Sequence, residues 1–131
     1  MKILQRILLL GIFTILFSGC GKYSSHYNAV GFVHSNTSSS AYMSFSSFDG
    51  TISFKLKCGE GERIQYSAEL GEGSATVYYD CDGKKKLLFL IGAGEEVFDF
   101  VRPSETGSIY IIVETDGKCE EGKLKFDVEK N

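Results

Sequence analysis

The sequence predicts an all-β protein, an antiparallel β-sandwich of seven or eight strands. Three observations predict this fold class. Apolar and polar residues alternate with period two through most of the chain after residue 50. Turns that contain glycine interrupt this alternation at intervals of about 8 to 12 residues. No segment beyond residue 20 shows a sustained helical period with capping residues.

The first three strands are predicted from rows of apolar residues that share one face of a strand. Each row ends at a turn, namely Gly59-Glu-Gly61, Gly71-Glu-Gly73 and Asp82-Gly83, and the last of these favours a tight hairpin. The predicted inward rows are Ile52, Phe54, Leu56 and Cys58; Ile64, Tyr66, Ala68 and Leu70; and Ala75, Val77, Tyr79 and Cys81.

Four more strands are predicted towards the C-terminus. The unbroken apolar run Leu87 to Ile91 predicts a strand buried on both faces, and Val97 to Val101 ends before Arg102-Pro103. The last two inward rows, separated by the turn Asp116-Gly117, are Ile109, Ile111 and Val113, and Leu124, Phe126 and Val128. This spacing is typical of jelly-roll and immunoglobulin-like sandwiches alike.

The closing hairpin resembles that of the bacterial pre-peptidase C-terminal domain, a jelly-roll accessory module. The resemblance rests on Gly107-Ser-Ile-Tyr-Ile-Ile-Val113 and on Lys123-Leu-Lys-Phe-Asp-Val128, with Ala75-Thr-Val-Tyr-Tyr-Asp80 as a similar middle strand. It implies a sandwich fold and a role in binding.

The N-terminus has the layout of a secretory signal peptide. Lys2 and Arg6 precede an apolar run from Ile7 to Phe17. Only 15 uncharged residues separate Arg6 from Lys22, whereas a helix that crosses a bilayer needs about 20. We therefore expect a signal helix over residues 1–19 that is cleaved off, and not a permanent membrane span.

The segment Leu16-Phe17-Ser18-Gly19-Cys20-Gly21 resembles the lipobox of bacterial lipoproteins. Phe17 departs from the pattern, because that position is usually leucine. The resemblance implies cleavage before Cys20 and attachment of the lipid to Cys20, which places the protein on the cell membrane or outer membrane, facing outside the cytoplasm. Two or more acyl chains hold a protein durably in a bilayer. An ordinary secreted protein and an uncleaved anchor are the alternatives.

Three regions are expected: a signal peptide over 1–19, a lipidated N-terminus and flexible tether over 20–40, and the β-sandwich domain over 41–131. Residues 21–40 contain no acidic group and end in a run rich in serine, a composition that does not support a fold of its own. The apolar patch from Ala29 to Val33 leaves open an additional strand at the domain edge.

The charge balance argues against nucleic acid as a partner. Removal of residues 1–19 leaves 112 residues, enough for one domain, with 12 basic and 17 acidic side chains, a net charge of −5. Proteins that bind a nucleic-acid backbone need a basic surface. No motif in the sequence implies a cofactor.

Beyond Cys20 the chain has three cysteines, Cys58, Cys81 and Cys119, which form one disulfide or stay as free thiols. Cys58 and Cys81 belong to inward rows and are expected to be buried, whereas Cys119 follows a turn and is expected to be exposed.

No metal site is expected, since the sequence lacks CxxC and HxxxH spacings. Asp80-Cys-Asp82-Gly83 looks like the start of an EF-hand loop, but the later ligands of such a loop are missing.

The sequence does not predict an enzyme. Both histidines, His26 and His34, belong to the tether or its edge, so no base held by the domain is evident. Four carboxylates in turns are better explained as solvated charges than as a glycosidase-like pair: Glu95, Glu96, Asp80 and Asp82.

Tyr78 and Tyr110 lie opposite the inward rows and are the candidate surface for a sugar or peptide ligand. We therefore expect a membrane-anchored lipoprotein that presents a small non-enzymatic β-sandwich for binding or adhesion at the cell envelope. The alternative is an envelope structural or assembly protein that docks a partner protein.

Overall fold

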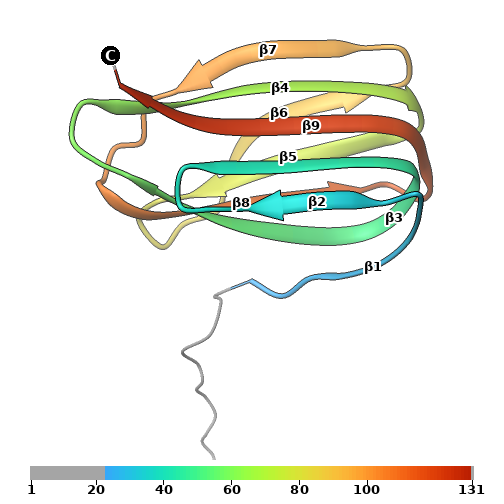
Figure 1. The fold of residues 1–131 in the computed structure, drawn as a ribbon, viewed down its shortest axis with the longest axis horizontal. Helices are drawn as coiled ribbons and strands as arrows, with labels where there is room; N and C mark the ends of the chain where they lie inside the picture. The colour runs from blue at the N-terminus through green and yellow to red at the C-terminus, as the bar shows by residue number, and fades with distance from the viewer. Residues whose placement is uncertain (1–22, 131) are drawn as a thin grey trace, which may run out of the picture.

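The computed structural model describes residues 23–130, and every regular element in this range is a β-strand (Figure 1). The predicted all-β antiparallel fold is confirmed. The predicted signal peptide and Cys20 lie outside the described residues. The strands are β1 (His26–Val30), β2 (Val33–Asn36), β3 (Ser40–Cys58), β4 (Glu62–Glu72), β5 (Ser74–Asp80), β6 (Lys86–Gly92), β7 (Glu96–Val101), β8 (Gly107–Thr115) and β9 (Cys119–Lys130).

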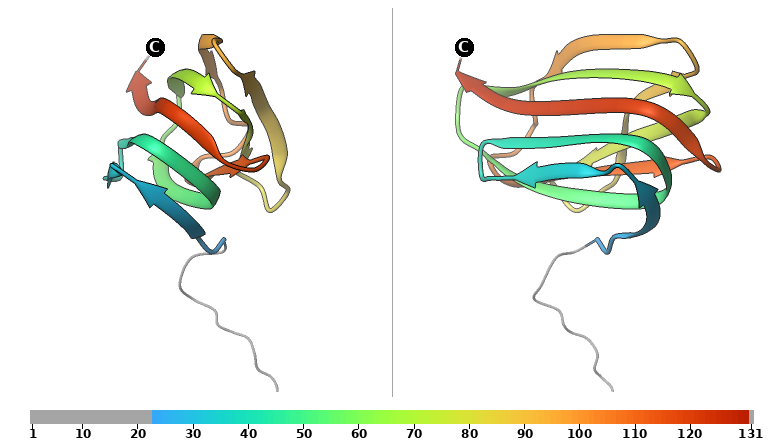
Figure 2. Two further views of the ribbon diagram at one scale, coloured as in Figure 1. Left: turned by 90° about the vertical axis from the view of Figure 1, so that its right-hand side faces the viewer. Right: turned by 45° about the vertical axis from the view of Figure 1, so that its right-hand side comes forward.

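The long strand β3 joins the two layers of the sandwich. Its residues 40–48 pair with β9, and its residues 51–58 pair with β8. β4 and β7 continue the layer of β9, while β5 and β6 continue the layer of β8, so the strand order is β6-β5-β8-β3-β9-β4-β7. The two layers face each other (Figure 2), and β6 contacts β4 and β7 on the far side, which nearly closes the sheet.

The core lies between the layers, and the inward row of β3 changes parity along the strand. Ala41, Met43 and Phe45 are buried in the first half, whereas the buried residues from Phe48 onward have even numbers. The change coincides with a break in the pairing of β3 with β9, where Glu121 has a positive φ of 55°. The change of parity lets one strand supply core residues to both layers.

The predicted inward rows of the central strands are confirmed. Ile52, Phe54, Leu56 and Cys58 are buried, as are the rows from Ile64 to Leu70 and from Ile109 to Val113. Tyr66 of one layer stacks on Phe89 of the other at 5.0 Å between ring centroids. Period-two alternation therefore identified the side chains that fill the sandwich.

The prediction that residues 87–91 are buried on both faces is wrong. Phe89 and Ile91 are buried, but Leu87 and Leu90 are 56% and 64% exposed. They point outward from β6, which pairs with β5, and none of the strands in the described part of the chain covers this face. An irregularity in register between Val77 and Tyr78 allows both leucines to point outward although they are three residues apart.

The prediction of a flexible tether up to residue 40 is corrected for the described part of that segment. β1 and β2 both pair with β3, so the region in which the sequence left open one edge strand contains two, and residues 23–130 form nine strands. The aromatic rings of Tyr27 and Phe32 pack against Phe48, whose side chain belongs to the core. These contacts provide the apolar burial that the serine-rich composition by itself does not supply.

The three cysteines of the domain are free thiols. Cys58 is buried and Cys81 is partly buried, in agreement with their inward rows. The prediction that Cys119 is exposed is wrong, because its side chain is fully buried. Cys119 lies opposite Phe48 in the pairing of β3 with β9, and its Sγ donates a hydrogen bond to the carbonyl oxygen of Ser74 at 3.2 Å.

Candidate functional site

The register of the first layer places two rows of side chains across its outer face. Residues directly opposite one another on paired strands share a face. One row therefore crosses β3, β9, β4 and β7 through Tyr42, Lys125, Ser67 and Phe98, and the next through Ser44, Lys123, Glu69 and Glu96. The inward neighbours of these residues are buried in the core, which fixes the strands beneath the rows.

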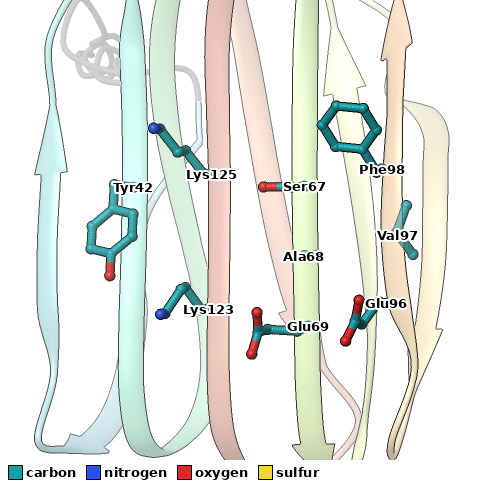
Figure 3. Close-up of a pocket in the computed structure, with 9 residues that line it drawn as sticks. All are labelled: Tyr42, Ser67, Ala68, Glu69, Glu96, Val97, Phe98, Lys123 and Lys125. Carbon is teal, nitrogen blue, oxygen red and sulfur yellow. The ribbon is translucent and has the colours of Figure 1, made fainter.

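The two rows line an open groove of about 510 Å³ on this face (Figure 3). This volume lies within the range of sites for small ligands. The figure shows Lys123 and Lys125 projecting from β9 towards Tyr42, and Glu69 and Glu96 projecting from β4 and β7 on the other side of the groove. The lining residues are Tyr42, Ser67, Ala68, Glu69, Glu96, Val97, Phe98, Lys123 and Lys125.

Aromatic rings stand at both ends of the first row. Tyr42 is partly exposed and Phe98 is 74% exposed. Because three strand spacings separate them, their backbones are about 14 Å apart. Phe100, the next outward residue of β7, lies beneath the Arg63 guanidinium at 4.4 Å from the ring centroid. The groove is thus bounded by the aromatic rings of Tyr42 and Phe98, with polar side chains between them.

The charged side chains of the groove are available to a ligand. Lys125 Nζ lies 3.8 Å from Asp127 Oδ2, a weak contact at the surface. Lys123, Glu69 and Glu96 make no ion pair or side-chain hydrogen bond with any of residues 23–130. The groove therefore presents ammonium donors on one side and carboxylate acceptors on the other.

The predicted ligand residues Tyr78 and Tyr110 lie on the outer face of the other layer. They point outward as expected, but each ring is covered. Lys85 Nζ lies 4.3 Å from the centroid of the Tyr78 ring, and the Tyr23 ring packs edge-on against Tyr110 at 5.7 Å. The structure therefore does not bring these two tyrosines together into an open surface.

The acidic residues considered in the sequence are mostly parts of turns. Asp80 is buried and accepts hydrogen bonds from the backbone N–H groups of Asp82 and Gly83. Glu95 caps its own turn by accepting a hydrogen bond from the Gly92 N–H at 2.6 Å. Of the four carboxylates that the sequence analysis considered, only Glu96 lines the groove. No cluster of His, Cys, Asp and Glu suited to a metal ion occurs within residues 23–130.

Sequence reasoning missed Tyr42 and Phe98. Tyr42 precedes the first strand that the alternation predicted, and Phe98 was included in a strand without an assigned role. A signal for Phe98 was available, because Phe98 and Phe100 alternate with Val97, Asp99 and Val101 and must share one face. Nothing local in the sequence places Tyr42 and Phe98 on the same sheet face.

Comparisons with known proteins show a distant similarity of fold. No family model matches the chain, and no curated protein matches it. A point mutant of a carbohydrate-binding module of family 29 is 11% identical, with a TM-score of 0.40, over 80% of this chain and 90% of that chain. A second family 29 mutant, made to probe ligand recognition, is 11% identical with a TM-score of 0.40, and the match covers 81% of this chain and 85% of that chain.

A third similar structure is Drosophila melanogaster CENP-C bound to CAL1, which is 13% identical with a TM-score of 0.34, over 80% of this chain and 76% of that chain. These values establish no ligand for the present chain. Within residues 23–130 there is also no helix of the length and apolarity that a membrane span requires.

Proposed function

We propose that this chain is a lipid-anchored lipoprotein of the bacterial cell envelope, and that its non-enzymatic β-sandwich binds a glycan in the groove between Tyr42 and Phe98. The observation that carries the proposal is the pair of aromatic rings, Tyr42 partly exposed and Phe98 largely exposed, at the two ends of one cross-strand row. Lys123, Glu69 and Glu96 lie beside this row and make no ion pair within residues 23–130.

The anchor is supported by the N-terminal sequence. The signal-peptide layout and the small residues before Cys20 resemble the lipobox segment of bacterial lipoproteins. Mass spectrometry of the purified N-terminus tests this part of the proposal. A diacylglyceryl group on Cys20 is expected, and an unmodified N-terminus or fatty-acid label that persists in a Cys20→Ser variant contradicts it.

A glycan suits the chemistry of the groove. One face of a sugar ring carries C–H groups that pack on an aromatic ring, and its hydroxyls accept and donate hydrogen bonds. Tyr42 and Phe98 offer the rings, while Lys123 and the two glutamates offer donors and acceptors. The open shape of the groove suits an extended ligand that lies across the strands.

A glycan array probed with residues 21–131 tests whether the domain binds a glycan. Variants of the groove residues then test whether the glycan binds in the groove. Phe98→Ala and Tyr42→Ala are each expected to weaken binding by about two- to twelvefold, because stacking of a ligand ring on an aromatic side chain contributes about 0.5–1.5 kcal/mol beyond the area it buries. Tyr78→Ala is the matched control on the opposite face. Equal losses in all three variants, or no glycan bound by the parent chain, would contradict the proposal.

A protein partner is the second candidate, and one observation favours it. Phe98 and Phe100 are both exposed on β7, an edge strand, at 74% and 41%. Pairing of a partner strand with this edge is opposed by Asp99, a charge at an inward-facing position of the edge strand. A partner would therefore contact the face of β7. Capture of one envelope protein that depends on Phe98 and Phe100, without glycan binding, supports this candidate.

A further inference from the structure

The N-terminal residues of the described chain lie on the face opposite the groove. The hydroxyl of Tyr23 donates a hydrogen bond to Asp80 Oδ2 at 2.5 Å, and its ring packs on Tyr110. Tyr23 O accepts a hydrogen bond from Ser53 Oγ, and the Oγ of Ser25 accepts one from the Ser53 N–H. The chain therefore approaches the domain across the outer face of the layer formed by β3, β8 and β5.

Covalent geometry ties the proposed anchor to this face. Cys20 precedes Tyr23 by three residues, and an extended chain spans at most about 3.6 Å per residue. The backbone of Cys20 is thus no more than about 11 Å from that of Tyr23. Figure 2 shows the described chain beginning beneath β1, at the bottom of the molecule, with β4 and β7 at the top.

Lysines and apolar side chains gather on the same face. Lys55 lies directly opposite Tyr110, and Lys57 is the next outward residue of β3. Neither makes an ion pair within residues 23–130, although the whole chain has a net charge of −3. Leu87 and Leu90, more than half exposed, point outward from β6 in the same layer.

The carboxylates of this face are already engaged or lie at its margin. Glu114 pairs with Lys85 at 2.6 Å, and Asp82 pairs with Lys86 at 3.1 Å. Asp80 is buried under Tyr23. Asp49 lies beside Asn28 of β1, at the edge of the layer. Lys55 and Lys57 therefore stand on this face as exposed positive charges without an ion-pair partner among residues 23–130, and such charges attract anionic headgroups.

We propose that the outer face of the layer β3-β8-β5-β6, with Lys55, Lys57, Leu87 and Leu90, lies against an anionic lipid bilayer, and that the groove consequently faces away from the membrane. This inference rests on the proposed lipid anchor. A short connection at Tyr23 holds the face at the bilayer, and the lysines and leucines supply the contact.

The test uses the full lipidated chain, after mass spectrometry has identified the lipid on Cys20. The protein is reconstituted into vesicles of phosphatidylethanolamine and phosphatidylglycerol and treated with a membrane-impermeant reagent that acylates lysine. Peptide mass spectrometry then gives the ratio of labelling at Lys55 and Lys57 to labelling at Lys123 and Lys125. The ratio within one molecule is independent of the side of the vesicle on which the protein lies.

The ratio is expected to fall about fivefold or more in vesicles relative to the same protein released into detergent, since each lysine at an anionic surface contributes about a factor of five to binding. A Lys55→Glu/Lys57→Glu variant, monitored at Lys84, is expected to lose this protection. The matched reversal Lys118→Glu/Lys130→Glu is expected to keep it.

Three results would overturn the inference. In the first, Cys20 is lipidated but the labelling ratio of Lys55 and Lys57 to Lys123 and Lys125 is unchanged or rises in vesicles. The domain then lies differently on the membrane, and the proposed anchor is unaffected. Protection of Lys55 and Lys57 that persists in detergent and grows with protein concentration assigns the face to a second copy of the chain. An unmodified Cys20 removes both the anchor and the orientation.

Discussion

Gly122 of β9 permits a close packing contact that supports the sheet beneath the groove. A Cβ atom at this position would lie 2.2 Å from Cζ of Phe45 and 2.7 and 2.8 Å from its two Cε atoms. Non-bonded carbon atoms normally stay about 3.5–4.0 Å apart. Phe45 is 7% exposed and packs against Phe48 at 5.4 Å between ring centroids, so its ring has little room to move.

Gly122→Ala is therefore expected to lower the free energy of unfolding by about 1–3 kcal/mol, the usual cost of forcing an additional methyl group into a packed core. In a domain of this size each kcal/mol corresponds to about 4 °C in Tm. Without the clash, replacement of glycine by alanine at a position with compatible backbone angles stabilises a protein by about 0.4–1 kcal/mol. Urea unfolding of residues 21–131 measures the difference.

A double-mutant cycle with Phe45→Leu isolates the clash, because leucine lacks the ring atoms that the new Cβ would meet. Gly122→Ala is expected to lower the free energy of unfolding by at least about 1 kcal/mol less in the Phe45→Leu background than in the parent chain. Gly59→Ala is the control, since a Cβ atom there would meet only the side chain of Glu62, with Oε1 at 3.1 Å. An equal cost in both backgrounds, or a stabilised Gly122→Ala, refutes the reasoning.

Three further predictions follow from the packing and the titratable groups. Burial and the hydrogen bond to Asp80 raise the pKa of Tyr23 from 10.0 to about 12. The contact should hold below pH 10 and be lost as the pH rises through 12. Burial also raises the pKa of Tyr66, so absorbance titration should show a late-titrating tyrosine signal from which Tyr23→Phe removes the part near pH 12. Burial raises the pKa of the Cys58 and Cys119 thiols, so iodoacetamide at neutral pH should modify the partly exposed Cys81 first; faster labelling of either buried thiol would contradict this. Phe89→Ala should cost about 3–5 kcal/mol in urea unfolding, because its ring stacks on Tyr66 between the layers; a cost below 1 kcal/mol would show that this stack does not hold the layers together.

The strand content and most of the core were predictable from the sequence. Alternation over Ile52 to Cys58 and over Ile64 to Leu70 identified which side chains enter the core, because successive residues of a strand point to opposite faces. The same reasoning failed at Leu87 and Leu90. An apolar run does not reveal whether a neighbouring layer covers each face of its strand, and no strand among residues 23–130 covers the outer face of β6.

The strands at the start of the domain were not predictable from composition. Residues 23–40 lack acidic groups and are rich in serine, yet β1 and β2 complete the edge of β3. Their stability comes from contacts distant in the sequence, such as Tyr27 on Phe48 and Tyr23 on Asp80. Cys119 is buried for a similar reason, since its position opposite Phe48 outweighs its place after a turn.

By itself, the sequence determined the all-β class, the inward rows and the resemblance of residues 16–21 to a lipobox. Only the tertiary structure decided that Tyr42 and Phe98, 56 residues apart, bound one groove, and that Tyr23 lies on the opposite face. The physical reason is that period-two alternation specifies the face of a strand on which a side chain lies. Which strands are neighbours, and in what register, depends on pairing between segments far apart in the chain.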